Sequence, residues 1–344
     1  IKRMTAEWEP QDAIMLAWPH KATDWAPMLE EARDCFSRII ETISTYQKVV
    51  VLINDADEAF YPQNYSHPKN ILPVVAPFND AWARDFGPLF LKEEDRLTLA
   101  DFKFNGWGLK FASDRDNLIN RVLYQKRCFS DSVVYQNQLD FVLEGGSLET
   151  DGQGTILTTS HCLLSPNRNG GHHQMQIEQE LKTRLSASRV HWIDYGHLTG
   201  DDTDSHIDTL ARFCNADTIA YVKCTSPEDV HYSSLLAMEE QLKNLKKPNG
   251  GFYQLIPLPM ARPVWENGQR LPATYANFLI INGAVLLPFY HSDKDEEARR
   301  ILQPLFPNRE IIGIDCRPLI RQNGSLHCVT MQLPKGVLNN DGGQ

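Results

Sequence analysis

A cysteine near the end of the chain lies in a polar segment that contains one glycine, residues 323–328 (NGSLHC). A cysteine thiolate is a strong nucleophile toward electron-poor carbon, so Cys328 is a candidate catalytic residue. A free cysteine is more often a small side chain of the core, and the segment alone does not exclude that interpretation. The two interpretations differ in the partners that they require, because a nucleophile needs groups that bind the substrate and move protons.

Ionisable residues of the necessary types occur in three other loops that are rich in polar residues and glycine. They are Asp85 before a Gly-Pro pair, Glu144 before a Gly-Gly pair, and His206 and Asp208 after the acidic stretch 201–204. Considered alone, Asp85 could be a turn residue, Glu144 the end of a strand, and the acidic stretch a solvated loop. Loops held by a rigid scaffold are also where catalytic residues concentrate.

Together these residues fit the hydrolysis of a guanidinium group, a planar cation that keeps its charge near neutral pH. Asp85 and Asp208 could bind its two edges through charge-assisted hydrogen bonds. Cys328 could then attack the central carbon. His206 suits proton transfer to the leaving ammonia and from the incoming water, and Glu144 could orient its imidazole. The set predicts a cysteine-dependent guanidine hydrolase.

Short motifs along almost the whole chain resemble those of agmatine deiminases (agmatine iminohydrolases), in the family shared with a bacterial type of peptidylarginine deiminase. The motifs are residues 6–10 (AEWEP), 82–88 (WARDFGP), 143–146 (LEGG), 163–169 (LLSPNRN), 206–208 (HID), 273–278 (ATYANF) and 327–330 (HCVT). Each motif is short, but their joint occurrence in this order is specific.

The resemblance implies an α/β fold of one catalytic domain, residues 1–344: a pentein-like propeller of five pseudo-symmetric ββαβ-type modules around a central active site. It implies that Cys328 forms a covalent amidino intermediate. His206 and Glu144 would be the acid–base pair, and Asp85 and Asp208 would bind the guanidinium. The implied reaction converts agmatine and water to N-carbamoylputrescine and ammonia, a step toward putrescine and other polyamines. The resemblance implies no metal and no organic cofactor.

Two positions beside the predicted site differ from the family pattern. Gly324 is the one glycine of a segment that is often glycine-rich in the family, and Ser205 stands where the family often has glycine. The same chemistry on free arginine or on a C-terminal peptidyl arginine is an alternative. The carboxylate of those substrates would need a cationic partner, and the sequence does not show which way Arg84 points.

The far end of the substrate distinguishes agmatine from arginine, and aromatic and acidic residues are the candidates for binding it. Trp82 and Trp107 have indole faces that suit an alkyl chain or an ammonium group. Glu9 and the Asp201-Asp202 pair could supply negative charge, which would disfavour the carboxylate of arginine. The alternative is that both tryptophans are core residues and that the acidic loop is solvated. The sequence predicts agmatine.

Two other classes of protein are alternatives. A metal-dependent amidinohydrolase could use His206 and Asp208 with the aspartates at 201, 202 and 204 as ligands, but that mechanism gives Cys328 no role. A non-catalytic guanidine-binding protein would keep the carboxylates and would not need Cys328 and His206. The presence of both favours cysteine chemistry without a metal.

The 344-residue chain carries a net charge of −10. An acidic surface argues against a nucleic-acid partner and mildly favours a small cationic substrate. Seven cysteines stand at wide spacings without a C-x-x-C pair, which argues against a zinc site or a disulfide framework. The longest apolar runs are strand-sized, so no membrane span is expected. We expect a cytoplasmic protein, and a homo-oligomer is compatible with these observations.

Short apolar runs alternate with helical patterns, which indicates an α/β fold without a linker. Strands are predicted at 13–18, 48–53, 71–75, 97–102, 155–159, 189–193, 218–222, 278–281 and 284–289. One helix is predicted to be capped by Asp24 and to run to Ile43, and another to begin at Ser226-Pro227 and end before Pro248. Weaker helical patterns cover 172–185 and 293–303.

Overall fold

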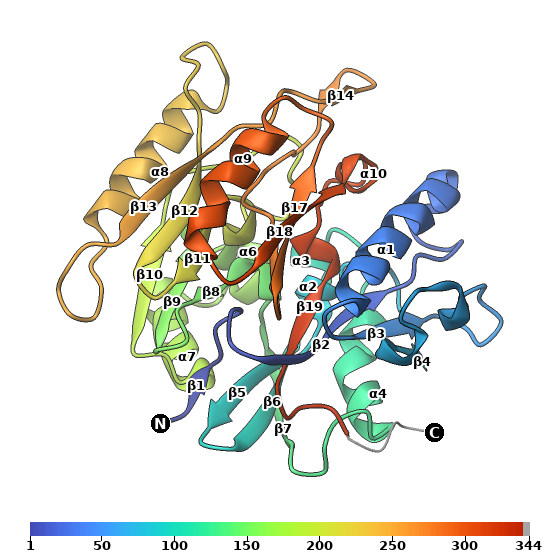
Figure 1. Ribbon diagram of the computed structural model, residues 1–344. Helices are drawn as coiled ribbons and strands as arrows, with labels where there is room; N and C mark the ends of the chain where they lie inside the picture. The colour runs from blue at the N-terminus through green and yellow to red at the C-terminus, as the bar shows by residue number, and fades with distance from the viewer. Residues whose placement is uncertain (340–344) are drawn as a thin grey trace.

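The computed structural model describes residues 1–339 and shows five small β-sheets around a common centre, with helices on the outside (Figure 1). In each of these sheets two antiparallel strands are followed by a strand parallel to the second of them. The connection between the parallel strands carries a helix, because parallel strands cannot be joined by a tight turn. The repeated unit is ββαβ, and the predicted five-module propeller is confirmed.

The five modules have the same composition with small additions. Their strands are β5 (Leu89–Glu93), β6 (Arg96–Lys103) and β7 (Val134–Val142), with β1 (Arg3–Met4) at the edge; β8 (Glu149–Thr150), β9 (Thr155–Thr159) and β10 (Arg189–Ile193); β11 (Ala211–Asn215), β12 (Thr218–Lys223) and β13 (Gln254–Pro259); β16 (Leu279–Ile281), β17 (Ala284–Phe289) and β18 (Glu310–Asp315); and β19 (Met331–Pro334), β2 (Gln11–Ala17), β3 (Lys48–Ile53) and β4 (Ile71–Val75). The corresponding helices are α4 (Ile119–Gln125), α7 (Gln174–Leu185), α8 (Tyr232–Asn244), α9 (Asp295–Leu302) and α1 (Leu29–Ser44). A separate hairpin pairs β14 (Trp265–Glu266) with β15 (Gln269–Arg270).

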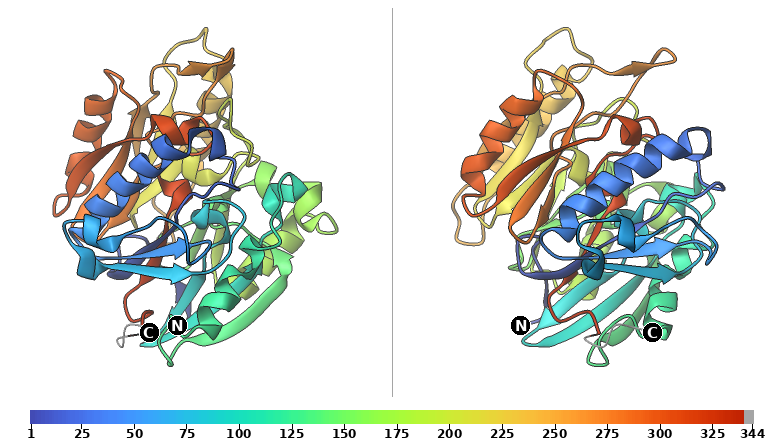
Figure 2. Two further views of the ribbon diagram at one scale, coloured as in Figure 1. Left: turned by 90° about the vertical axis from the view of Figure 1, so that its right-hand side faces the viewer. Right: turned by 45° about the vertical axis from the view of Figure 1, so that its right-hand side comes forward.

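The sequence of each element matches its place in the module. The five apolar residues of β3 are all buried, as expected for a strand with parallel neighbours on both sides and both faces covered. On α1, Phe36, Ile39 and Ile43 recur at helical spacing and are buried, so this helix turns one face toward the sheets. Figures 1 and 2 show the helices on the outer side of the molecule. Within residues 1–339, no helix is both long and apolar enough to cross a bilayer.

The last module joins the two ends of the described chain. β19 lies beside β2 in antiparallel register, with Met331 opposite Met15 and Leu333 opposite Ala13 (Figures 1 and 2). Cys328 lies in the short turn just before β19, so this pairing brings the candidate nucleophile to the centre.

Equivalent short turns precede the first strand of each module, and four of the five carry a predicted site residue. Asp85 is in α2 (Ala83–Phe86) before β5, and Glu144 precedes η5 (Gly145–Ser147) before β8. Asp208 is in η6 (Ile207–Thr209) before β11, and Cys328 is in η8 (His327–Val329) before β19. The turn before β16 carries Asn277. Because α2 contacts η5 and η8, and η5 contacts η6, the propeller gathers these turns at its centre.

All nine predicted strands are confirmed within a residue or two at each end, whereas two predicted helix starts are wrong. Asp24 does not cap a helix: a 3-10 turn, Ala26–Met28, follows Trp25, and α1 begins at Leu29. The second predicted helix begins at Tyr232 instead of Ser226, and it ends at Asn244. The residues before it form turns instead, with the amide of Asp229 bonded to the carbonyl of Ser226 at 3.1 Å and the amide of Tyr232 bonded to the carbonyl of Asp229 at 3.0 Å. The weaker patterns correspond to α7 and α9.

Candidate active site

Cys328 lies at the inner end of the module that closes the ring. Only 7% of the residue is exposed, and its Sγ is 3.4 Å from Asn277 Oδ1. The same amide oxygen accepts the backbone N–H of His327 at 2.9 Å, so Asn277 holds the turn that presents the cysteine. Gly324 packs against the ring of Trp82: a Cβ at this position would lie 2.2 Å from a ring carbon. The one glycine kept in this segment is therefore the one that the packing requires.

Asp85 is fixed by two hydrogen bonds and faces His206. Its Oδ2 accepts from Trp107 Nε1 at 2.8 Å, and its Oδ1 accepts from the backbone amide of Gly146 at 3.0 Å. His206 Nδ1 lies 3.6 Å from the same Oδ1. Trp107 adopts a left-handed backbone conformation, with φ of 59°, within a short helix, α3 (Gly106–Leu109), where the two flanking glycines also have positive φ.

His206 and Glu144 form a buried pair that Arg168 completes. His206 Nε2 is 2.8 Å from Glu144 Oε1. Arg168 donates to both oxygens of Glu144, each at 2.9 Å, and its Nη1 donates to Asp204 at 2.6 Å. Such a bidentate pair fixes the plane of the carboxylate and therefore the position of the imidazole. Ser205, before His206, has φ of 64°, a left-handed conformation that explains why glycine is common at this position. The backbone amide of Ser205 donates to Asp201 Oδ2 at 2.9 Å.

Asp208 is completely buried, and its two oxygens have different surroundings. Oδ2 lies 2.8 Å from His327 Nδ1, whereas Oδ1 has no hydrogen-bond partner among residues 1–339. An unpartnered buried carboxylate oxygen is costly, so it is a natural binding point for a cation.

Gly146 marks the point where these side chains converge. A Cβ on Gly146 would lie 2.6 Å from both Asp85 Oδ1 and His206 Nδ1, and 3.2 Å from Asp208 Oδ2. Any larger residue would displace them, which accounts for glycine in this motif.

The converging side chains border a central cavity. Asp85, His206 and Cys328 line it, as do Trp82, Trp107 and Asp202 of the predicted substrate contacts. Glu144 and Asp208 are not among its lining residues: Glu144 contacts the lining residue His206, and Asp208 lies next to Gly146 and close enough to Cys328 for its charge to act on the thiol. The lining is acidic, since Asp24, Asp80 and Asp201 join Asp85 and Asp202, and none of the lining residues among 1–339 is a Lys or Arg.

The prediction for Glu9 is wrong in its geometry. Glu9 binds Arg3 through both oxygens at 2.8 Å and accepts the amide of Ala6 at 2.6 Å, at a separate surface depression. Its neighbour Glu7 points inward instead, to His327 and Arg212. The segment turns here, with the amide of Glu9 bonded to the carbonyl of Ala6 at 3.1 Å, so the two glutamates point in different directions, and the motif alone does not show which one faces the site.

A model of the Porphyromonas-type peptidyl-arginine deiminase family matches residues 3–334. The chain belongs to this family. A solved structure from Porphyromonas gingivalis, named "Putative Arginine Deiminase", is 51% identical, covers 98% of this chain and 100% of its own, and superposes with a TM-score of 0.94. A C. jejuni agmatine deiminase, a cysteine-to-serine variant with substrate bound, is 39% identical over 98% of this chain and 97% of its own, with a TM-score of 0.90. A Legionella pneumophila protein named "Putative agmatine deiminase" is 34% identical over 96% of this chain and 94% of its own.

The ionisable groups at the cavity of this family member have pKa values shifted in different directions. Burial raises the pKa of the Cys328 thiol well above its usual range, and the charges of Asp208 and Asp85 raise it further. Burial opposes the charged form of His206, but Asp85, Cys162 and Glu144 outweigh it and raise its pKa well above the usual value. Burial likewise opposes ionisation of Glu144, yet His206 and Arg168 lower its pKa to about 2. A cation in the cavity would favour the thiolate of Cys328.

The histidine also belongs to the one group of side chains, within residues 1–339, whose geometry could suit a metal ion. Atoms of Glu144, Cys162 and His206 lie within 4.8 Å of one another. Arg168 already neutralises Glu144, and Asp204 of the alternative ligand set pairs with Arg168 and Lys110. The charge arrangement therefore disfavours a cation there. That the reaction is metal-independent stays a prediction.

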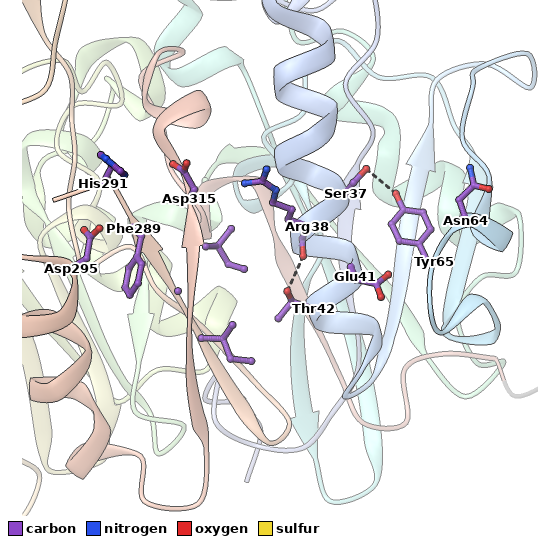
Figure 3. Close-up of a pocket in the computed structure, with 13 residues that line it drawn as sticks. Ser37, Arg38, Glu41, Thr42, Asn64, Tyr65, Phe289, His291, Asp295 and Asp315 are labelled. Atoms are coloured by element: carbon purple, nitrogen blue, oxygen red, sulfur yellow. Dashed lines mark hydrogen bonds between the residues drawn. The ribbon is translucent and has the colours of Figure 1, made fainter.

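A second hollow lies on the outer surface, between α1 and the sheet of β18 (Figure 3). Arg38 and Glu41 of α1 line it opposite Asp315 and His291, and Ser37 bonds the hydroxyl of Tyr65 at 3.1 Å. None of the predicted site residues lines it. The central cavity is therefore the candidate active site.

The pH dependence of the reaction should report on Asp85. Burial raises the pKa of Asp85 to about 6, although His206 opposes the shift. Below that pH the carboxyl is neutral and no longer attracts a guanidinium, so kcat/KM should fall as pH drops through about 6. In the complex the bound cation favours the carboxylate, so the fall in kcat should occur at lower pH. Profiles of both parameters check this, and a fall in kcat/KM only near the ordinary value of about 4 would contradict it.

Proposed function

We propose that this protein hydrolyses agmatine to N-carbamoylputrescine and ammonia through a covalent amidino intermediate on Cys328. The observation that supports it most is that Cys328, His206 and Asp85 meet at one acidic cavity, with Glu144 bonded to His206 and the buried Asp208 close to Gly146 beside them. Each group suits one requirement of guanidinium hydrolysis, and the agmatine deiminases among the relatives share the fold at up to 39% identity in the C. jejuni structure.

The reaction follows from these positions. The guanidinium binds between Asp85 and the free Oδ1 of Asp208, and its charge favours loss of the Cys328 proton to solvent. The thiolate attacks the guanidinium carbon and forms a carbon–sulfur bond. Protonated His206 gives its proton to the departing nitrogen, so ammonia leaves and a cationic S-amidino cysteine remains.

Water completes the cycle on the same histidine. Neutral His206 takes a proton from the water that attacks the amidino carbon, and Glu144 stabilises the imidazolium that forms again. The carbon–sulfur bond then breaks, the hydroxyl becomes the ureido carbonyl, and its proton passes to the sulfur. In solution the released ammonia takes up the proton that the thiol loses in the next cycle. No metal or organic cofactor enters these steps.

The charge of the cavity favours agmatine over arginine. Burial and the neighbouring Asp201 raise the pKa of Asp202 to about 6, as expected where carboxylates crowd together. The ammonium of agmatine would relieve this repulsion, whereas the carboxylate of arginine would add to it. Arg84 offers that carboxylate no partner, because its guanidinium points to Gln332 and Glu7 behind the site. The product would enter putrescine and polyamine synthesis.

Substrate choice can be measured directly. We expect kcat/KM for agmatine to exceed that for free arginine and for a C-terminal peptidyl arginine by at least about 100-fold, since an unpaired buried charge costs several kcal/mol. Ammonia release from the three substrates under one set of conditions checks this. A ratio near or below unity would assign the protein to arginine or peptidylarginine, which the names of the family and of the P. gingivalis relative favour.

We also infer the cellular compartment of the protein and the class of its ligand. Seven cysteines are free, and six of them are buried, which suits a reducing compartment such as the cytoplasm. The net charge of −10 suits a small cationic substrate and disfavours nucleic acid.

A further inference from the structure

The motif at residues 6–10 has no role in the steps above, yet Glu7 from it reaches the underside of the site. Its Oε1 lies 2.6 Å from His327 Nε2, and its Oε2 accepts from Arg212 Nη2 at 3.0 Å and from the amide of Ile280 at 2.8 Å. Burial opposes the charge of Glu7, but His327, Arg212 and Arg84 outweigh it and hold its pKa below the usual range. Glu7 is therefore an ionised carboxylate under the turn that carries Cys328.

His327 has one carboxylate at each ring nitrogen. Nδ1 is 2.8 Å from Asp208 Oδ2, and Nε2 is 2.6 Å from Glu7 Oε1. Ionised carboxylates only accept hydrogen bonds, so both ring nitrogens must carry a proton for both contacts to be hydrogen bonds. That requires the imidazolium form of His327. Arg212 Nη2 also lies 3.1 Å from Nε2, but it donates to Glu7 at 3.0 Å.

The hydrogen bond and the charge of His327 both act on Asp208. The hydrogen bond from His327 fixes Oδ2 and leaves Oδ1 without a partner among the described residues. Burial opposes ionisation of Asp208, but the hydrogen bond and charge of His327 hold its pKa below the usual range. A neutral imidazole would lose this charge effect.

We propose that Glu7 is a positioning residue of the deiminase reaction, which keeps His327 an imidazolium and thereby keeps Asp208 ionised and oriented for the guanidinium. The inference rests on the proposed function. It also gives a role to the N-terminal motif, whose Glu7 connects the start of the chain to its last module.

Other charged groups around His327 come from several modules. Arg84 of α2 donates from Nε to the carbonyl of His327 at 3.3 Å, and Arg212 of β11 lies beside the ring. Glu149 of β8 binds Arg212 Nε at 2.6 Å and has no hydrogen bond to His327. Glu149 is thus a matched control, because it is a buried carboxylate of the same network on the far side of Arg212.

The test compares Glu7→Gln with wild type over a pH range, with ammonia release from agmatine as the readout. Glutamine keeps an acceptor at the ring but removes the negative charge that faces Nε2, so the variant favours the imidazolium of His327 less than wild type does. The ratio of wild-type to variant kcat/KM should rise with pH to about 100-fold, the effect of a misplaced binding group. Asp85 and His206 titrate in both proteins and cancel in the ratio.

His327→Gln provides an independent variant, which also serves if Glu7→Gln does not fold. It can never form an imidazolium, so its loss of kcat/KM should be similar in size and constant with pH. Glu149→Gln should change the ratio with pH much less than Glu7→Gln does, because Glu149 makes no hydrogen bond to His327. A constant ratio for Glu7→Gln, or near-normal kcat/KM for His327→Gln, would overturn the inference. Wild-type protein without activity on agmatine would instead overturn the proposed function and this inference with it.

Discussion

Cys328→Ser should abolish ammonia release from agmatine, lowering kcat by at least about 10,000-fold, as expected when a covalent nucleophile is removed. The serine hydroxyl is a far weaker nucleophile than a thiolate, and no other cysteine lines the central cavity among residues 1–339. The hydroxyl can occupy the place of the thiol beside Asn277, so binding of agmatine and the thermal stability should change little. Steady-state assays and calorimetric binding measure the two effects separately.

Cys214→Ser is the matched control for that experiment. Cys214 is also buried, but it does not line the central cavity, its Sγ contacts the carbonyl of Arg212, and burial raises its thiol pKa to about 12. Its replacement should keep most of the activity. Substantial turnover by Cys328→Ser, or its loss in Cys214→Ser with the fold intact, would contradict the assignment.

Asp85→Asn and Asp208→Asn should each lower kcat/KM for agmatine by about 100-fold or more, because leaving a buried charge unpaired costs about 3–5 kcal/mol. Asp85→Asn can keep one of the hydrogen bonds from Trp107 and Gly146, so its fold should persist. Asp208→Asn removes the carboxylate between His327 and the proposed guanidinium position. Kinetics with agmatine, together with circular dichroism, check both variants.

Asp101→Asn is the control, because it removes a buried carboxylate that does not line the cavity. Asp101 is fully buried and bonded to Tyr135 at 2.6 Å, outside the cavity. Its replacement should lower thermal stability and leave kcat/KM within a few-fold of wild type. Near-normal kinetics for Asp85→Asn or Asp208→Asn would remove that residue from the proposed binding pair.

Local patterns in the sequence were sufficient for the strands with continuous apolar runs, such as β3 and β17, because burial on both faces leaves a clear signal. Strands such as β7 and β13 mix polar residues or prolines with apolar ones, so periodicity alone does not identify them. The five-module arrangement came from the resemblance, because each module buries its faces only against neighbours that are distant in sequence.

The chemical types of the site residues could be predicted, but their supporting partners could not. Arg168 and Asn277 lie in the short motifs at residues 163–169 and 273–278, yet only the folded ring brings Arg168 to Glu144 and Asn277 to Cys328. Glu7 and Glu9 have the same side chain two residues apart, and their hydrogen bonds to His327 and Arg3 distinguish them. Signals for such partners depend on contacts between modules, which a single sequence does not contain.

Mass spectrometry of protein quenched with acid during turnover can detect the proposed covalent intermediate on Cys328. Intact wild-type protein should carry an adduct equal in mass to agmatine less ammonia, and digestion should place it on the peptide that contains Cys328. Cys328→Ser treated in the same way should carry no adduct. An adduct on another cysteine, or steady turnover without any adduct in a quench fast enough to capture a single cycle, would contradict the mechanism.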